Sequence, residues 1–326
     1  MKRNTLITPF SYLCSGIAIL LPLAIVANSS MLGPPTQVMY QWHDSSKFSR
    51  VIVNATQGIE IRPRVWFAQD RLVTDFTITN ASEIGREKAQ KQYQATRQLL
   101  ISYGIAVGTY TSGTTVKPER EQTYWPLPMV PLEQMPSSSR YKGTWPGEPS
   151  RRVIDVSDPA TRRALQQSIR RLWQQFPAPV RFVDNAAAHS RLGGSQNWSD
   201  YCANIKEIRI MGAAMGSRQI FNVAVRIGSM SDQETLQLMD AVGDHGIALE
   251  MPWERGILQT EEGTKRTRNR YRQMLDSGMG VVMVPVEGDP KELVEWVRTW
   301  RKPTDHLYLS GVFYKSPDQA LFGPGH

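Results

Sequence analysis

Two acidic residues each close an otherwise apolar stretch of the sequence. Residues 179–185 read PVRFVDN and end in Asp184 and Asn185, and residues 245–254 read HGIALEMPWE and carry Glu250. Burying a carboxylate at the end of a buried strand costs free energy unless it has a partner or a function. Cleavage of a glycosidic bond requires two carboxylates that face one pocket. One protonates the leaving oxygen, and the other attacks the anomeric carbon or activates water. Asp184 and Glu250 are therefore the candidate catalytic pair, and the alternative is that each caps a helix or pairs with an arginine.

Five further residues are candidates for binding a sugar substrate. Tyr110 and Trp253 present flat aromatic faces that suit pyranose rings, with core packing as the alternative. Asn185 and Asn222 carry amides that suit sugar hydroxyls, although asparagine is common at turns and strand ends. Asp155 lies in residues 151–158, RRVIDVSD, where a helix-capping loop is the alternative to a substrate contact.

Short apolar strands and helical segments alternate along most of the chain. We expect eight strands, at residues 73–79, 104–110, 153–155, 180–184, 220–227, 246–251, 280–286 and 307–313. We expect helices at residues 81–101, 159–175, 198–215, 231–242, 261–277 and 290–300. The strands are nearly continuous in apolar residues, as parallel strands covered on both faces are. Eight such units predict an α/β fold, a single-domain (β/α)8 TIM barrel, in which active-site residues lie at the carboxyl ends of the strands.

An open doubly wound sheet is the alternative fold. That fold usually carries a glycine-rich phosphate-binding turn after its first strand. The sequence contains neither GxGxxG nor GxxxxGK[ST], which argues against a nucleotide cofactor.

A long segment separates the second and third expected strands. Residues 112–150 hold seven prolines and show no periodicity. A connection of this length is uncommon in a compact domain unless it is functional. We therefore predict a long proline-rich functional loop after the second strand.

The amino terminus predicts export. Lys2 and Arg3 precede an apolar run from Leu13 to Val26, and small or neutral residues follow it. This is the layout of a secretory signal, and the run is short for a spanning helix, which needs about 20 residues. The alternative is an uncleaved membrane anchor. We thus divide the chain into a signal peptide or anchor at residues 1–29, an extension at 30–60 and the barrel at 61–326, in a secreted, periplasmic or cell-envelope protein.

Composition excludes several classes of site. The 326 residues include 2 cysteines and 5 histidines with no HxxxH or HxH spacing, so we expect no metal site and no cofactor. The net charge is +8, and much of the basic excess lies in residues 265–272, KRTRNRYR. Without a recognised binding module this cluster favours a solvated helix over nucleic-acid binding. An anionic surface is a weaker alternative partner.

Several of these stretches resemble one enzyme family. Residues 152–159 read RVIDVSDP, residues 181–185 RFVDN, residues 249–253 LEMPW and residues 108–113 GTYTSG. Together they resemble the endo-α-1,4-polygalactosaminidase family and related TIM-barrel glycoside hydrolases of bacteria, over residues 60–315. Family members often carry a glycine–aspartate pair before the fourth strand and a second aspartate after it. Here PVR at 179–181 and AAA at 186–188 stand instead, a departure that bears on the substrate more than on the fold.

The resemblance implies a glycoside hydrolase acting on a polysaccharide, including polymers that contain amino sugars. By the family's pattern Asp184 and Glu250 are the two carboxylates. By analogy with related barrels, Asp184 is the nucleophile and Glu250 the general acid/base. The alternatives are a catalytically inactive carbohydrate-binding barrel and an envelope-associated interaction protein. The oligomeric state is not predicted.

Overall fold

The structure is a computed structural model that describes residues 61–68, 71–102, 106–187, 198–251, 260–283 and 295–309. The chain divides into two units, Met1–Gly33 and Pro34–His326, and all described residues belong to the second. The expected signal segment, the extension at 30–60 and Trp253 lie outside the described residues. Within the described ranges, no helix is long and apolar enough to cross a membrane.

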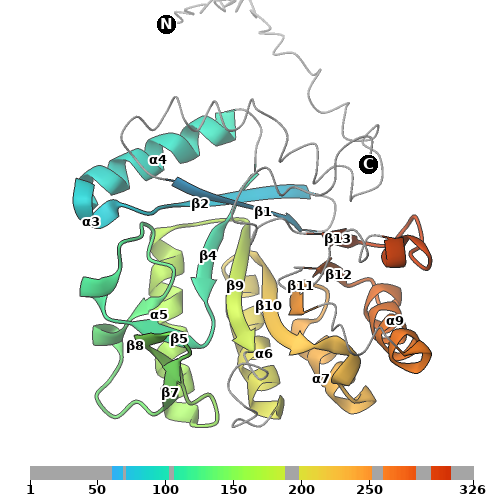
Figure 1. The fold of residues 1–326 in the computed structure, drawn as a ribbon. Helices are drawn as coiled ribbons and strands as arrows, with labels where there is room; N and C mark the ends of the chain where they lie inside the picture. The colour runs from blue at the N-terminus through green and yellow to red at the C-terminus, as the bar shows by residue number, and fades with distance from the viewer. Residues whose placement is uncertain are drawn as a thin grey trace, which may run out of the picture. The chain divides into compact units, whose positions relative to one another are not determined.

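Six parallel strands form the central sheet. Its order is β13-β12-β11-β10-β9-β4, and every neighbouring pair is parallel. The strands are β4 (Thr109–Ser112), β9 (Val180–Ala187), β10 (Arg218–Arg226), β11 (Gly246–Met251), β12 (Gly280–Met283) and β13 (Leu307–Leu309). Figure 1 shows β4, β9 and β10 side by side. Parallel strands end at the same edge, so polar residues that close them gather there.

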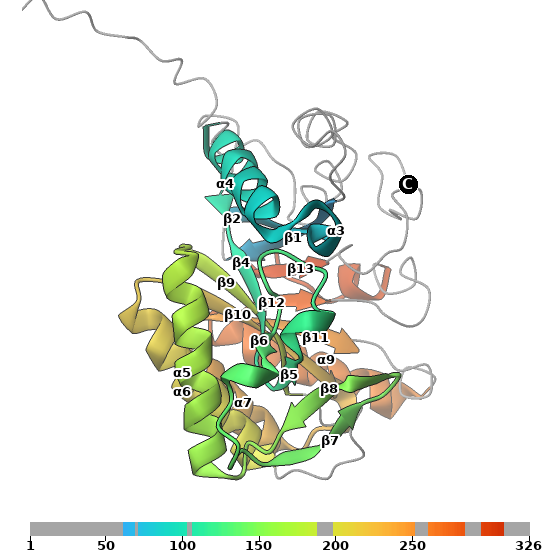
Figure 2. The same cartoon turned by 90° about the vertical axis from the view of Figure 1, so that its left-hand side faces the viewer.

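Four of the helices in the described ranges lie between these strands, where the sequence predicts helices. They are α5 (Pro159–Gln175), α6 (Trp198–Ala214), α7 (Asp232–Val242) and α9 (Glu261–Asp276). Asp158 caps α5 by accepting from the backbone N–H of Thr161, and Ser231 and Glu234 form a capping box at the start of α7. α6 packs against β9 and β10, and Figure 2 shows α5 and α6 beside the sheet.

The first expected strand lies in a smaller sheet. β1 (Ile61–Ala68) and β2 (Arg71–Ile78) are antiparallel, and β2 is parallel to β3 (Ala106–Val107), one residue before β4. The helix expected at 81–101 is two helices, α3 (Ala81–Ile84) and α4 (Arg86–Ser102). Gly85 separates them with a φ of 85°, in the left-handed region that glycine adopts without strain.

The prediction of a closed eight-stranded barrel is not met by the described residues. The expected third strand at 153–155 falls in β8 (Glu148–Ile154), which pairs antiparallel with β5 (Thr115–Lys117) and with β7 (Tyr141–Trp145). With β6 (Val130–Pro131) these strands form a separate sheet in the order β6-β5-β8-β7. The segment 112–150 therefore contains strands of a small sheet, which turns and two short 3-10 helices connect, rather than being wholly irregular. Its strands span two to seven residues, too short for most of them to show a period among seven prolines.

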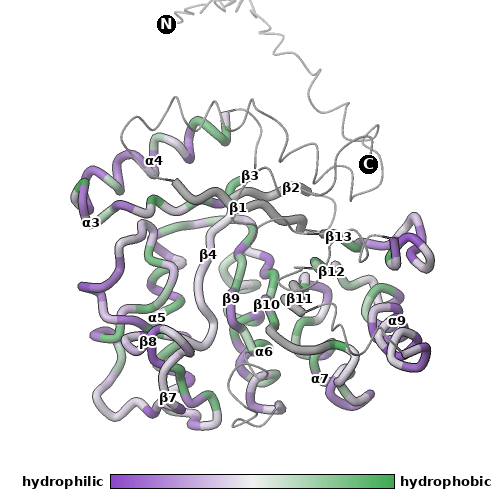
Figure 3. The backbone as a smooth tube through the Cα atoms, in the orientation of Figure 1, coloured by the Kyte–Doolittle hydropathy of each residue, from purple (hydrophilic) through white to green (hydrophobic). Residues whose placement is uncertain are grey.

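Hydrophobic packing joins the main sheet to its helices. Figure 3 shows α9 as largely hydrophilic, as expected for a helix with one face in solvent. All eight residues of β9 are buried, including Arg181. The Arg181 guanidinium donates to the carbonyls of Trp173 and Phe176 and lies 4.6 Å from the centre of the Trp173 ring. The amino-terminal edge of the sheet is thus fixed by structural hydrogen bonds, and the opposite edge carries the candidate site.

Candidate functional site

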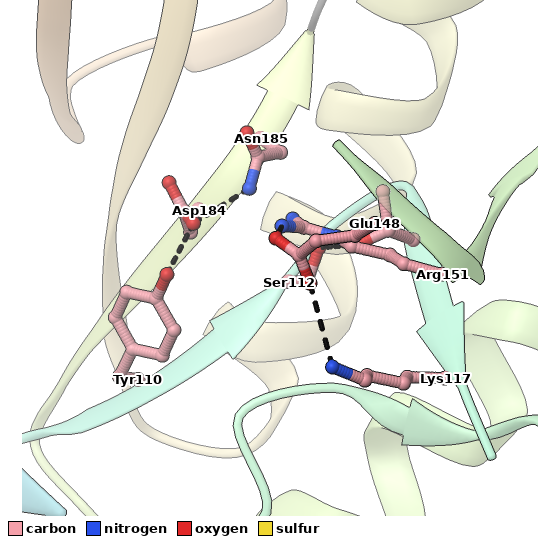
Figure 4. A network of polar contacts seen from close by, with 8 residues as sticks. Tyr110, Ser112, Lys117, Glu148, Arg151, Asp184 and Asn185 are labelled. Atoms are coloured by element: carbon pink, nitrogen blue, oxygen red, sulfur yellow. Dashed lines mark hydrogen bonds and ion pairs between the residues drawn. The ribbon is translucent and has the colours of Figure 1, made fainter. Parts of the chain in front are cut away.

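Asp184 is a buried carboxylate in the carboxyl-terminal half of β9, where three side chains donate hydrogen bonds to it. Its residue surface is 6% exposed. Tyr110 donates its hydroxyl hydrogen bond to Oδ2, and Asn185 donates from Nδ2 to the same oxygen at 2.6 Å. Asn222 donates from Nδ2 to Oδ1 at 2.6 Å. Figure 4 shows Tyr110 and Asn185 pointing at the carboxylate from β4 and β9. The structure thus brings together four of the seven residues singled out in the sequence.

A backbone irregularity in β9 creates this arrangement. Val183 pairs with Phe221 of β10, and the next pair is Ala187 with Val223. Between these two pairs β9 therefore has more residues than β10, which forms a bulge. Asn185 lies inside this bulge with a φ of 49°. Asparagine tolerates the left-handed region better than most non-glycine residues. The bulge lets the neighbouring Asn185 side chain turn back onto Asp184, and bulges of this kind re-aim side chains next to active sites.

The strand β4 approaches the bulge so closely that a glycine is needed. The Gly113 N–H donates to the Asp184 carbonyl at 2.6 Å, and the Thr114 hydroxyl donates to the Asn185 carbonyl at 2.5 Å. A Cβ at Gly113 would lie 2.9 Å from Cγ1 of Val183 and 3.1 Å from Cα of Ala186. Residues 113 and 114 therefore fix two consecutive carbonyls of the backbone, those of Asp184 and Asn185.

The donors determine what Asp184 can do. An ionised carboxylate only accepts hydrogen bonds, so three donors match the ionised form. A carboxylate that accepts hydrogen bonds in this way can attack an electrophilic carbon or stabilise positive charge. They suit it poorly to delivering a proton. The arrangement fits the role of nucleophile better than that of general acid.

A pocket of about 240 Å³ is lined by Tyr110, whose hydroxyl donates to Asp184, and Asp184 itself is not among its lining residues. Ser112 lines it and stands opposite Asp184 in the pairing of β4 with β9. The lining combines two tyrosines with polar and charged side chains: Thr77, Tyr110, Ser112, Lys117, Tyr124, Pro128, Met129, Glu148 and Arg151. Tyr110 is thus the residue that both lines the pocket and touches the carboxylate.

Sequence reasoning missed three charged residues of this pocket. Lys117, Glu148 and Arg151 come from the segment 112–151, most of which the sequence predicts to be a functional loop without singling out any residue in it. Their partners explain why no local pattern identifies them. Lys117 Nζ lies 3.5 Å from one oxygen of Glu148, and Arg151 Nη1 lies 3.3 Å from the other. The irregular burial along β8 gives no local signal that would single out Glu148 and Arg151.

The remaining predicted residues lie elsewhere or outside the described side chains. Asp155 follows β8 in a turn, where its carboxylate accepts from the backbone N–H of Ser157 and lies 3.5 Å from Lys142 Nζ. Glu250 belongs to β11, although its side chain lies outside the described part, as does the whole of Trp253. Among the described residues, no three of the types His, Cys, Asp and Glu gather as metal ligands.

Groups with strongly shifted pKa lie away from this pocket, and burial is the main cause in each case. Burial lowers the pKa of His245 to about 4 and that of Arg181 to about 10. Burial raises the pKa of the Cys202 thiol to about 12, which keeps it unreactive. His245 directly precedes β11 and Arg181 is the second residue of β9, so both lie at the amino-terminal edge of the sheet. These shifts accompany packing rather than catalysis.

No protein-family model matches this chain, and no curated protein matches its sequence. One similar solved structure is Aspergillus fumigatus Ega3 in complex with galactosamine, with a TM-score of 0.44 and 9% identity over 67% of this chain and 79% of that chain. Another is a glycoside hydrolase family 20 β-N-acetylglucosaminidase, with a TM-score of 0.36 and 11% identity over 71% of this chain. The match spans about half of that second protein, 51%. Both likenesses are too distant to assign a function to this chain.

The contact between Asn222 and Asp184 predicts a pH-dependent variant. Asn222→Asp keeps the side-chain size but sets a second carboxylate within hydrogen-bond distance of Asp184, so the two share one proton. The pair's folded pKa is raised above the unfolded value. The free energy of unfolding of the variant is therefore highest below about pH 4 and falls as the pH rises through the raised pKa of the pair. The loss is about 1.4 kcal/mol for each tenfold difference in proton affinity between the folded and unfolded chains.

Urea unfolding between pH 4.5 and pH 8 measures this effect. The matched control is Asn269→Asp on the exposed face of α9, which we expect to follow the wild-type pH profile. A profile for Asn222→Asp that parallels the wild type would contradict the described contact.

Proposed function

We propose that this protein is a glycoside hydrolase that cleaves a polysaccharide. The observation that carries the proposal is the Asp184 carboxylate, held by three donors at the carboxyl end of a parallel strand beside a pocket with two tyrosines. A fixed carboxylate next to aromatic rings suits a reaction in which positive charge develops on a sugar ring.

In this proposal Asp184 is the nucleophile and Glu250 the general acid/base. An oxygen of Asp184 attacks the anomeric carbon while Glu250 transfers its proton to the glycosidic oxygen, which leaves with the departing sugar. Glu250 then takes a proton from water, and the water oxygen displaces Asp184 from the anomeric carbon. Both carboxyl groups return to their starting states at the end of the cycle.

The backbone register supports the choice of Glu250 as the second carboxylate. On β11, Glu250 lies between Leu249 and Met251, which pair with Val223 and Arg226 of β10. Between these two pairs β10 has one more residue than β11. The pairing of the strands is therefore irregular at Glu250 as well as at Asp184. Both acids therefore belong to the same carboxyl-terminal edge, separated by a single strand.

The substrate contacts in this proposal fall into two groups. Tyr110 and Trp253 bind a sugar ring, and Asp155 binds a more distant part of a long chain. Asn185 and Asn222 act first as positioning residues, because each donates to Asp184. The amino-sugar substrate remains an expectation from the resemblance.

Two isosteric substitutions test the catalytic roles. Asp184→Asn removes the nucleophile and Glu250→Gln removes the transferable proton, so each should lower the release of reducing ends by at least about 100-fold. The assay is a panel of bacterial exopolysaccharides, including polymers of amino sugars. Asp305→Asn is the matched control, because Asp305 is also a buried aspartate (8% exposed) but pairs with Arg272 ahead of β13.

The outcomes separate the enzyme from its alternative. Full activity in either carboxylate variant would overturn the assigned roles. Binding of a polysaccharide without release of reducing ends by the wild type would favour a catalytically inactive carbohydrate-binding protein.

We also propose that the protein is exported by its first 29 residues. The basic start, apolar run and small residues near Ser29 are the support for this proposal. Cell fractionation followed by amino-terminal sequencing tests it. A mature chain that begins near residue 29 outside the cytoplasm is the expected result, and a cytoplasmic chain that begins at Met1 would contradict it.

A further inference from the structure

The pocket beside Asp184 carries an excess of positive charge. Its charged lining residues are Lys117, Arg151 and Glu148, two cations and one anion. Glu148 contacts both cations, at 3.5 Å and 3.3 Å, so its charge is already shared between them. The described lining residues therefore carry a net charge of +1, because one carboxylate is shared by two cations.

Arg151 is held in place with part of its guanidinium unused. Its Nε donates to the Thr115 hydroxyl oxygen at 3.0 Å, and its guanidinium carbon lies 4.2 Å from the centre of the Trp145 ring. Nη1 contacts Glu148, whereas the described residues offer no partner for Nη2. A guanidinium fixed on two sides with a free terminal N–H is pre-organised to bind an anion.

A hydrogen-bond chain ties this cation to the candidate catalytic strand. The Thr115 hydroxyl that accepts from Arg151 lies 2.5 Å from the Ser112 hydroxyl. Ser112 pairs with Asp184 across β4 and β9, and both Ser112 and Tyr110 line the pocket. Figure 4 shows Arg151, Glu148 and Lys117 grouped near Ser112, with Tyr110 and Asp184 beside them. A sugar on Tyr110 would therefore lie within reach of the cations.

We propose that this pocket is a subsite for a sugar ring that carries an anionic substituent, a carboxylate or a sulfate ester. The inference rests on the proposed function, since it specifies the substrate class of the same site. Lys117 supplies a flexible point charge and Arg151 a fixed donor. A protonated free amino group at this position meets two cations and is disfavoured. Amino sugars of the polymer would occupy other positions or be acylated.

Calorimetric titration of the full-length protein with four small ligands tests the proposal. The ligands are methyl β-D-glucuronide, D-glucose 6-sulfate, methyl β-D-glucoside and D-glucosamine. We expect one of the two anionic sugars to bind at least about tenfold more tightly than the glucoside, and glucosamine to bind more weakly than the glucoside. The stronger of the two anions identifies the substituent. Increasing salt should weaken only the anionic ligands.

Two variants locate the effect. Lys117→Met and Arg151→Lys should each lower the affinity for the anionic sugar by about tenfold without changing the affinity for the glucoside. If Arg151→Lys disturbs folding, Lys117→Met alone tests the proposal. Lys206→Met is the matched control, because Lys206 is an ion-paired lysine on α6 that does not line the pocket. Equal binding of all four ligands, or anion binding unaffected by Lys117→Met, would overturn the proposal.

Failure of this subsite and failure of the proposed function give different results. Anion-selective binding without hydrolysis of any polymer would overturn the enzyme and leave the subsite intact. Hydrolysis that depends on Asp184 but prefers neutral or cationic polymers would overturn the subsite and leave the enzyme intact.

Discussion

The burial of the Asp184 carboxylate is the constraint on which the rest of the site depends. A charge that is almost entirely removed from water needs hydrogen bonds to be tolerated. Tyr110, Asn185 and Asn222 provide them from three places in the fold: β4, the bulge of β9, and β10. Each donor requires its own strand to be in register, so the parallel order β10-β9-β4 and the irregularity at Asn185 are structural requirements of one buried carboxyl group.

The small sheet gives this carboxylate its surroundings. β5 and β8 bring Lys117, Glu148 and Arg151 beside Tyr110, and the Thr115–Ser112 contact joins them to β4. A regular barrel would place a third parallel strand next to β4. Here β8 pairs within its own sheet, and the chain uses the segment to build a charged pocket wall. The pairing of β8 within the small sheet therefore accounts both for the departure from barrel topology and for the charged residues of the pocket.

The helices and most strands of the main sheet are predictable from the sequence because they are governed by local rules. Asp158 and Pro159 start α5, the Ser231–Glu234 box starts α7, and β9 to β12 are short apolar runs. Asp184, Asn185 and Tyr110 can be identified because each is polar at the end of an expected apolar strand, and Asn222 because it is a polar residue within an apolar run. The small sheet and its cations cannot be predicted in this way, since antiparallel pairing of β5, β7 and β8 depends on contacts distant in sequence. The pattern locates a strand at 153–155 but does not identify its partners.

The separation between the Asp184 and Glu250 carboxyl carbons, measured in a crystal structure of the protein, tests the central claim most directly. A retaining glycosidase predicts about 5–5.5 Å, and about 6.5–9.5 Å would keep the pair but assign an inverting reaction. Carboxyl groups that point to opposite faces of the sheet, or that lie much farther apart than this, would contradict the account.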